Sequence, residues 1–293
     1  MTGPRLLVAA LAPAILLIAC TSDPDEDACP QPDPPAVAGA GPSVLPDLNG
    51  GSTPHAYTVE VVDRMEHDTT AFTQGLLHAD GRLYESTGLY GESDLRLVQP
   101  ETGEVLLDAA MDEQFFGEGL ALHDGRLFQL TWREQQLFVW DRCTLDELDQ
   151  LDYAGEGWGL VGDGEVLWRS DGTSVLHQHD PETFEVIGTA EVTDRSVPLA
   201  RLNELELVDG LIMANVFTES WIAVIDPESG DVVAWVDASP VVTEVGATDP
   251  GDVLNGIAVD PASGRLWLTG KRWPTLFEVR IVSGDELPPP GLL

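Results

Sequence analysis

From residue 55 onward, short runs of apolar and β-branched residues alternate with turns rich in Gly, Asp and Asn. No convincing helical period interrupts this alternation, which is typical of an all-β fold. An Asp-Gly dipeptide between two apolar runs, such as Asp80-Gly81, predicts a tight β-hairpin. Several other pairs of runs are joined in the same way, so we expect a succession of hairpins along the chain.

One segment of the chain recurs five times, each copy holding an apolar strand, a tight turn and a second strand. The copies begin at Phe72, Phe116, Gly157, Leu202 and Leu254. Their equivalent positions are separated by 44, 40, 45 and 52 residues. Periods of about 40–50 residues with this content are typical of β-propeller blades. The sequence therefore predicts a five-bladed β-propeller, in which Tyr57–Val62 supplies the fourth strand that the last repeat lacks.

The first strand of every propeller blade lines the central channel, so equivalent residues of the five repeats should converge near one mouth of it. The alignment puts one set of side chains at this position: Gln74, Glu118, Trp158, Asn203 and Asn255. Four of the five are polar and one carries a carboxylate. A second set follows at the end of the next strand: Gly88, Trp132, Gly172, Phe217 and Lys271. Apolar walls around a few convergent polar groups are typical of a binding pocket, although such residues also serve simply to pack a channel.

Composition excludes several classes of protein. The chain has 293 residues, of which 43% are hydrophobic, and a formal net charge of −37. An acidic chain repels phosphate backbones, so we expect no nucleic-acid partner. The apolar fraction is too high for a disordered chain. Lys271 is the only lysine, which makes its place in the second set notable.

The N-terminus resembles an export signal. Arg5 precedes an uncharged apolar run from Leu6 to Ala19, which has the length of a signal-peptide core and is too short to span a bilayer. The run ends in Leu17-Ile18-Ala19-Cys20, which resembles a bacterial lipobox, although a secretory signal with a chance cysteine has the same appearance. We therefore expect residues 1–19 to be removed and Cys20 to be lipidated, giving a cell-envelope lipoprotein on the periplasmic or extracellular face that meets the membrane through this anchor only.

Residues 20–54 form the expected tether. Residues 21–54 hold eight prolines, six acidic residues, no basic residue and no aromatic residue, a composition that cannot bury enough apolar surface to offset the entropy of ordering. Cys29 lies within this linker and is free to pair with Cys143 in an oxidising compartment, while two free thiols are the alternative. The folded domain should then span residues 55–285, followed by a tail at 286–293, and we expect a monomer.

Several ordered motifs resemble the glutamine cyclotransferases of plants and bacteria. They include Phe116-Gly-Glu-Gly119, Gly157-Trp-Gly-Leu160, Leu202-Asn-Glu-Leu-Glu206 and Thr269-Gly-Lys-Arg-Trp-Pro274, and the similarity spans residues 57–282. The resemblance implies an enzyme that cyclises the N-terminal glutamine of peptides or proteins to pyroglutamate with release of ammonia. It also implies that no catalytic zinc, and no other cofactor, is required.

The resemblance also implies roles for single residues. Glu118 would be the general acid and base, and Gln74 and Asn203 would bind substrate. The walls of the pocket would be Phe72, Phe116, Trp132, Trp158 and Phe217, with Lys271 as a further site residue. Phe217 departs from the family, which usually has Trp after Ala-Asn-Val, so the selectivity of that wall is open. Trp221 would compensate only through a shift of four residues.

Two other functions remain open on the sequence alone. A catalytically silent propeller lipoprotein could bind peptides or envelope partners through the same mouth. A metal-dependent propeller hydrolase would need several axial carboxylates, whereas the ring offers only Glu118, with Glu204 and Glu206 next to a ring position. Four aspartates, Asp68, Asp163, Asp171 and Asp252, could hold a structural calcium, although Asp in hairpins commonly serves only the turn. His177 and His179 share one side of a strand and are expected at a polar surface.

Overall fold

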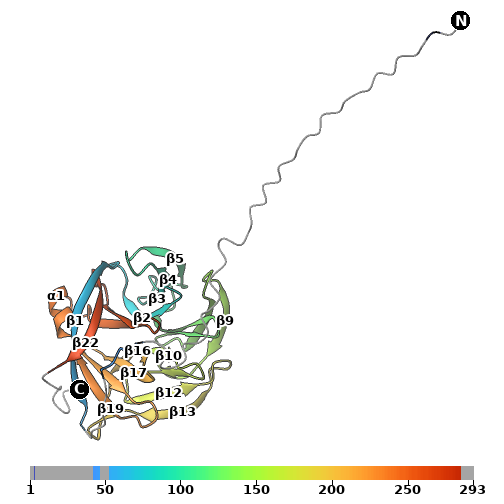
Figure 1. The fold of residues 1–293 in the computed structure, drawn as a ribbon. Coiled ribbons are helices and arrows are strands. Elements are labelled where there is room, and N and C mark those ends of the chain that lie inside the picture. The colour runs from blue at the N-terminus through green and yellow to red at the C-terminus, as the bar shows by residue number, and fades with distance from the viewer. Residues whose placement is uncertain (1–2, 4–41, 47–52, 285–293) are drawn as a thin grey trace. The chain divides into compact units, whose positions relative to one another are not determined.

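The computed structural model describes residues 3, 42–46 and 53–284, and all of its secondary structure lies within the unit Pro32–Leu293. The signal segment, Cys20, Cys29 and the tail at 286–293 lie outside the described residues. The fold is nearly all-β (Figure 1), so the predicted fold class is confirmed at that level. Among the described residues, no helix is long and apolar enough to cross a membrane.

Three of the sheets contain four antiparallel strands each, in chain order. The first is β2 (Thr73–Ala79), β3 (Arg82–Thr87), β4 (Asp94–Val98) and β5 (Val105–Ala110). The second is β6 (Gly117–His123), β7 (Arg126–Thr131), β8 (Gln136–Asp141) and β9 (Glu147–Asp152). The third is β10 (Leu160–Gly162), β11 (Leu167–Arg169), β12 (Val175–His179) and β13 (Val186–Glu191).

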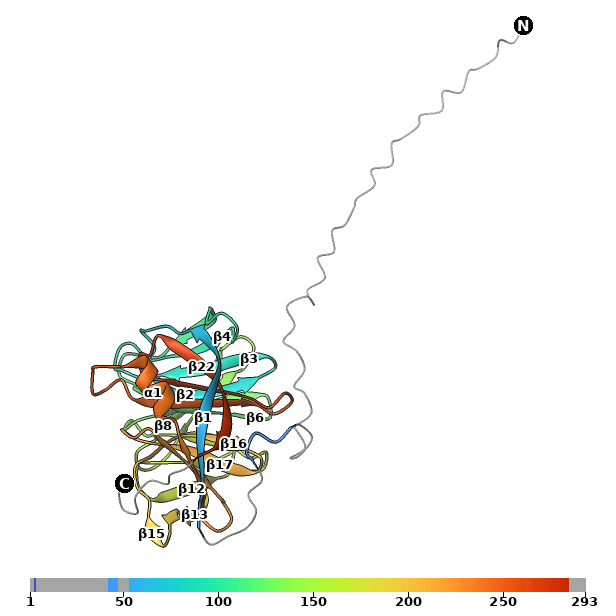
Figure 2. The same ribbon diagram turned by 60° about the vertical axis from the view of Figure 1, so that its left-hand side comes forward.

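An eight-stranded sheet joins two further runs of four strands. One run is β16 (Leu202–Val208), β17 (Leu211–Val216), β18 (Trp221–Ile225) and β19 (Val232–Asp237). The other is β20 (Leu254–Asp260), β21 (Arg265–Gly270), β22 (Thr275–Ser283) and β1 (His55–Glu66). Strand β1 pairs antiparallel with β22, beside which it lies in Figure 2, so the prediction that Tyr57–Val62 completes the last repeat is confirmed. Its other edge pairs in parallel with β19.

The first strands of the five repeats contact one another in the closed order β2, β6, β10, β16, β20 and back to β2. Figure 1 shows β2, β10 and β16 near the middle of this unit, while β5, β9 and β13 lie at its outside. The apolar clusters fill the spaces between neighbouring runs of four strands, where Trp235 and Trp267 are fully buried. This packing brings the predicted ring positions together.

The hairpin turns follow their sequences. Asp and Gly both have positive φ at Asp80-Gly81 (52° and 73°) and at Asp124-Gly125 (45° and 72°), as a two-residue type I′ turn requires. Asp209-Gly210 has the same geometry, with φ of 54° and 81°. Because these turns require Asp-Gly or a similar pair, the repeats can be recognised in the sequence.

Three features of the fold were not predicted. The helix α1 (Ser239–Val245) and the two-stranded hairpin of β14 (Thr193–Asp194) and β15 (Val197–Pro198) interrupt the repeats. Residues 42–46 also lie against the folded body, although they belong to the segment expected to be a tether. The Asp209 carboxylate accepts hydrogen bonds from the backbone N–H groups of Val44 and Leu45 at 3.0 and 2.9 Å, and Leu45 is buried in the core.

Candidate active site

Irregularities in the first strands position the ring residues. In four of these strands the register shifts at the ring position, between Thr73 and Gly75, Gly117 and Leu120, Leu202 and Leu205, and Leu254 and Ile257. A β-bulge changes the direction of a side chain, which in a regular strand would point to one face of the sheet. Gln74, Glu118, Asn203 and Asn255 all occupy such bulges, and all four are buried.

The residue after each ring position lets the first strands approach closely. Gly75, Gly119, Gly159 and Gly256 follow the ring residues of four repeats. A Cβ atom at Gly75 would lie 2.6 Å from the backbone nitrogen of Leu120, a distance that no side chain tolerates. Backbone approach at the centre therefore requires glycine in these repeats.

In the fourth repeat, Glu204 occupies the position after the ring residue, where the other repeats have glycine. Here the first strands are connected through the buried Glu204 carboxylate and not by close approach of their backbones. The two oxygens accept hydrogen bonds from the N–H groups of Leu76 on β2 (3.4 Å) and Ile257 on β20 (3.0 Å). Burial raises the pKa of Glu204 well above its ordinary value, and the two backbone donors only partly oppose this. The carboxylate thus joins three first strands, and both of its oxygens are engaged by backbone N–H groups.

Glu118 is the buried carboxylate of the ring. Its Oε1 accepts a hydrogen bond from Nε2 of Gln74 over 3.2 Å, and the Gln74 Oε1 in turn receives Nδ2 of Asn255 at 3.5 Å. Burial raises the pKa of Glu118 well above its ordinary value, the charge of Lys271 opposes the shift, and the charges of Glu156 and Glu134 add to it. The carboxyl therefore binds a proton more tightly than a carboxyl in water does.

Lys271 is the cation of the site. It is 4% exposed, and its Nζ lies 4.8 Å from the ring centroid of Phe72 and 5.2 Å from that of Phe217. Burial lowers the pKa of Lys271 to about 8, although the charge of Glu118 raises it. The two aromatic faces and the carboxylate together keep an ammonium group in a nearly dry site.

Aromatic rings surround these groups in a series of edge-on and tilted contacts. The ring centroid of Phe116 lies 6.2 Å from that of Phe72 and 5.5 Å from that of Trp132. On the other side, Trp158 meets Phe217 edge-on at 5.6 Å. The structure thus gathers all five aromatic residues named from the sequence into two groups near Glu118 and Lys271.

The residues of the second set occupy equivalent backbone positions. In four repeats the backbone N–H of the second-set residue donates a hydrogen bond of 2.8–3.0 Å to a backbone carbonyl. That carbonyl belongs to the residue two positions before the ring residue. The donor and acceptor pairs are Gly88 and Phe72, Trp132 and Phe116, Phe217 and Arg201, and Lys271 and Val253. Phe217 therefore lies where the alignment put it. Trp221 does not replace it, because its indole packs edge-on against Trp235 at 6.3 Å.

Asn203 differs from the other ring amides in its partners. Its backbone carbonyl accepts the hydroxyl of Ser170 at 2.7 Å, but its side-chain amide forms no hydrogen bond with another described residue. The side chain of Asn203 is buried. With no partner among the described residues, this buried amide is available to bind a polar group of a ligand.

The sequence interpretation missed Glu156. Its Oε2 accepts hydrogen bonds from the indole N–H groups of both Trp132 (2.9 Å) and Trp158 (3.1 Å). Its Oε1 accepts Nε of Arg133 at 3.1 Å. Burial alone would raise the pKa of Glu156, but these donors lower it below the ordinary value. A signal was present, because Glu156 stands two residues before its ring position, as Phe72 and Phe116 do.

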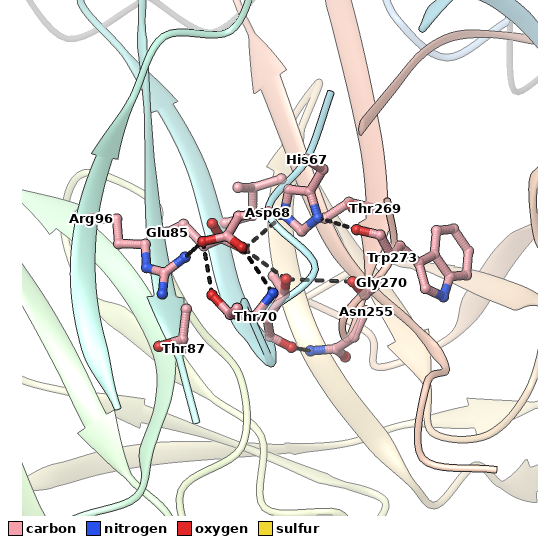
Figure 3. Close-up of polar contacts among 12 residues, drawn as sticks. His67, Asp68, Thr70, Glu85, Thr87, Arg96, Asn255, Thr269, Gly270 and Trp273 are labelled. Atoms are coloured by element: carbon pink, nitrogen blue, oxygen red, sulfur yellow. Dashed lines mark hydrogen bonds and ion pairs between the residues drawn. The ribbon is translucent and has the colours of Figure 1, made fainter. Parts of the chain in front are cut away.

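A buried ion pair supports the Lys271 loop and the start of β2 (Figure 3). His67 bonds through Nδ1 to the carbonyl of Trp273 at 2.7 Å and through Nε2 to Glu85 at 3.0 Å. Both partners are acceptors, which favours the doubly protonated ring and agrees with the raised pKa of His67. Thr73, the neighbour of Gln74, donates its hydroxyl to the same Glu85 oxygen at 2.6 Å. One carboxylate thus connects the Gln74 strand to the loop that carries Lys271.

His179 corrects one expectation. It was expected at a polar surface together with His177, yet it is fully buried. Its Nδ1 bonds to the carbonyl of Phe184 at 2.7 Å, and its Nε2 accepts Nε of Arg169 at 3.1 Å. Burial lowers the pKa of His179 to about 4. The ring is therefore a neutral structural residue, a role that alternation along a strand does not reveal.

The four aspartates considered for calcium lie in turns and ion pairs. Asp163 caps its own turn through the N–H groups of residues 165 and 166, and Asp171 bonds to Thr173 and His177. Asp68 pairs with Arg96, and Asp252 with Arg272. Across the described part of the chain, no three His, Cys, Asp or Glu residues are grouped so as to hold a metal ion. A structural calcium stays an untested prediction.

The cysteine predictions fall largely outside the described residues. Cys143 is disulfide-bonded, and its predicted partner Cys29 lies in the undescribed part of the chain. The pairing of Cys29 with Cys143 therefore stays a prediction.

Comparison with known proteins decides the family. The sequence profile described as glutamine cyclotransferase matches residues 36–281. The chain belongs to the glutamine cyclotransferase family. It is 41% identical over 229 residues to a glutaminyl-peptide cyclotransferase of Arabidopsis thaliana, covering 76% of this chain and 71% of that protein. The resemblance found in the sequence motifs is thereby confirmed.

A solved structure of a family member has the same fold. The crystal structure of Myxococcus xanthus glutaminyl cyclase superposes with a TM-score of 0.76 at 40% sequence identity, covering 79% of this chain and 100% of that one. The fold described above is therefore that of a glutamine cyclotransferase family member.

Proposed function

We propose that this protein cyclises the N-terminal glutamine of peptides or proteins to pyroglutamate and releases ammonia. Family membership supports this activity. The observation that carries the mechanism is the buried Glu118 carboxyl, which among the described residues is hydrogen-bonded by Gln74 alone and lies within the influence of Lys271.

The reaction requires one proton to be moved twice. The α-amine of the substrate attacks the carbonyl carbon of its own side-chain amide, so a C–N bond forms and the amine must lose a proton. Glu118 accepts that proton and then delivers it to the departing amide nitrogen, which leaves as ammonia when the second C–N bond breaks. A single carboxyl serves both steps, and a raised pKa brings it nearer to the pH at which such exchange is efficient.

The remaining groups position the substrate. The free side-chain amide of Asn203, and Gln74 next to Glu118, are suited to bind the amide or peptide carbonyl of the substrate. The aromatic walls around Phe116 and Phe217 exclude water and hold the aliphatic part of the glutamine. Holding the amine within reach of the amide carbonyl supplies a large part of the acceleration in an intramolecular reaction. The steps assigned here use the protein's own groups and pass through no cofactor.

Architecture and location complete the proposal. The five runs of four strands, and the closed order of their first strands, support a five-bladed β-propeller in which this site lies at one channel mouth. We further propose a monomeric lipoprotein of the cell envelope, anchored through Cys20 and a linker in residues 21–41 to a catalytic domain at 55–285. Residues 42–46 pack against that domain instead of extending the linker. Expression of the Cys20→Ala variant in a bacterium tests the anchor: lipid mass and detergent partitioning should both disappear.

The activity is tested by ammonia release from glutamine-initiated dipeptides. The matched control is the same peptide with an acetylated α-amine, which cannot attack. We expect ammonia only from the free peptide, at an unchanged rate in the presence of a chelator. Peptide binding without ammonia release would contradict the proposed enzymatic activity and favour a catalytically silent peptide-binding protein instead.

A further inference from the structure

Glu156 joins two walls of the site that come from different sheets. Trp132 follows the end of β7, whereas Trp158 precedes β10, yet both indole N–H groups donate to the same oxygen, Oε2. Each bond has an ionised acceptor, which makes it stronger than a bond between neutral groups. One carboxylate thus fixes the rotation of two tryptophan rings at once.

A cation completes the arrangement. The guanidinium of Arg133 lies 3.6 Å from the centroid of the Trp132 ring and also donates to Oε1 of Glu156. The ion pair is well exposed, with 57% of the Arg133 side chain and 39% of the Glu156 side chain accessible, so by itself it contributes little. Its effect is to hold the second carboxylate oxygen, which leaves Oε2 directed at the indoles.

Each of the two tryptophans contacts a further aromatic residue of the pocket wall. Trp132 contacts Phe116, and Trp158 contacts Phe217, whose ring faces Lys271. Glu156 therefore links both aromatic groups that surround Glu118. Both indoles are only partly buried, so packing alone leaves them room to change rotamer.

We propose that Glu156 is a positioning residue for glutamine cyclisation, acting through the indoles of Trp132 and Trp158 to hold the substrate in its reactive geometry. This inference rests on the proposed function, because it assigns a role in that reaction. Glu156 has a second effect through its charge, which raises the pKa of Glu118 along with Glu134 and against Lys271.

Two substitutions separate the geometric effect from the electrostatic one. Glu156→Gln keeps an oxygen to accept both indole N–H groups and removes the charge, whereas Glu156→Ala removes both. Glu134→Gln is the matched control, since Glu134 influences Glu118 by charge but bonds to the Tyr90 hydroxyl and to backbone N–H groups and makes no bond to an indole.

The readouts are kcat and KM for a glutamine-initiated dipeptide, the pH profile of kcat/KM, and near-ultraviolet circular dichroism of the tryptophans. For Glu156→Ala we expect a loss of up to about 10²-fold in kcat/KM, with a changed tryptophan spectrum. For Glu156→Gln we expect a native spectrum and a KM near that of the wild type. Both Glu156→Gln and Glu134→Gln should move the acid limb of the profile to lower pH, because each removes a charge that raises the pKa of Glu118.

The outcomes that overturn the inference differ from those that overturn the proposed function. A wild-type spectrum in Glu156→Ala shows that the carboxylate does not hold the indoles, whatever the activity. A changed spectrum with wild-type kcat/KM shows that holding them does not matter for cyclisation. Absence of ammonia release from the wild-type enzyme contradicts the proposed function and with it the positioning role. The circular dichroism spectrum still shows whether Glu156 holds the indoles of Trp132 and Trp158.

Discussion

The side-chain amide of Gln74 donates a hydrogen bond over 3.2 Å to Oε1 of Glu118, its equivalent in the neighbouring sheet. Asn255 positions Gln74 in turn. Its Nδ2 donates hydrogen bonds to the side-chain oxygen of Gln74 (3.5 Å) and to the backbone carbonyl of Thr73 (3.0 Å). Equivalent positions of three repeats thus form one polar chain that ends on the proposed proton carrier. The orientation of Glu118 is therefore set before substrate arrives.

Replacing Glu118 by Gln should abolish most of the turnover. The variant keeps the shape of the side chain but cannot accept a proton, and loss of general acid and base catalysis is worth about 10²–10⁴-fold in kcat. Thermal unfolding should show no loss of stability, because a buried ionisable group has been replaced by a neutral one. Steady-state ammonia release measures the effect.

Glu204→Gln is the matched control for that variant. Glu204 is also a buried carboxyl of a first strand, but its oxygens hold the backbone N–H groups of Leu76 and Ile257. Its replacement should lower the melting temperature and keep kcat within a few-fold. A Glu118→Gln enzyme that retains most of its kcat would assign the proton transfer to another group.

Replacing Lys271 by Met should move the acid limb of the pH profile of kcat/KM to higher pH. The ammonium of Lys271 opposes the upward shift of the Glu118 pKa, so its removal lets that pKa rise further and the base form appears only at higher pH. Above the Lys271 pKa of about 8, the wild type itself loses the cation and the two profiles should converge. A limb that stays in place, or moves to lower pH, would contradict the electrostatic coupling.

Repetition made the centre of the fold predictable. Each repeat carries a ring residue followed by glycine or Glu204, and a turn signal in its first hairpin. Alignment of the repeats alone therefore predicted that Gln74, Glu118 and Asn255 lie together. The bulges that aim these side chains were not visible, because a bulge depends on the partner strand as well as on the strand itself.

Features that arise between repeats were hidden. His67 and Glu85 meet through the fold, and the second partner of His67 is the carbonyl of Trp273, 206 residues away. No local period reports such a contact. Glu156 was missed for another reason: it occupies the place of Phe72 and Phe116, but its chemical type differs, so a search for aromatic walls passed over it.

The buried pair of His67 and Glu85 should make stability depend on pH. Burial lowers the pKa of His67, but the charge and hydrogen bond of Glu85, the bond to the Trp273 carbonyl and the charge of Asp68 together outweigh it, so the net shift is upward. The stabilisation is complete below the unfolded pKa of about 6.5 and is lost as pH rises through the raised folded pKa. Glu85 has a lowered folded pKa, so its contribution is present above an unfolded pKa of about 4.3 and disappears as pH falls through the folded value.

Urea unfolding of His67→Leu, Glu85→Leu and the double variant tests this pair. Each single variant leaves one buried charge without its partner, which costs about 3–5 kcal/mol. The double variant should recover part of that loss and should lack the decrease in stability that the wild type shows as pH rises above about 6.5. Additive losses in the double variant would show that the two residues act independently.

Replacing Phe217 by Trp should lower KM for glutamine-initiated peptides. Phe217 meets Trp158 edge-on and faces the Nζ of Lys271, so a larger ring at this position adds aromatic contact worth about 0.5–1.5 kcal/mol. Because an indole attracts a cation more strongly than a phenyl ring does, the variant should also raise the pKa of Lys271. Phe217→Leu is the matched control, since it keeps an apolar side chain but removes the aromatic face, and it should raise KM.

The opposing effect in that variant is steric. Trp158 already lies against Gly172, where a Cβ atom would come within 2.7 Å of its ring, so Trp158 cannot move toward β11 and β12 to make room for an indole at 217. If the larger ring collides instead of fitting, overpacking costs about 1–3 kcal/mol and the melting temperature falls. Kinetics and a thermal melt on the same preparation distinguish the two results. A variant whose KM and melting temperature both equal those of the wild type would show that residue 217 has no contact with bound substrate, and that the wall of the pocket ends at Trp158.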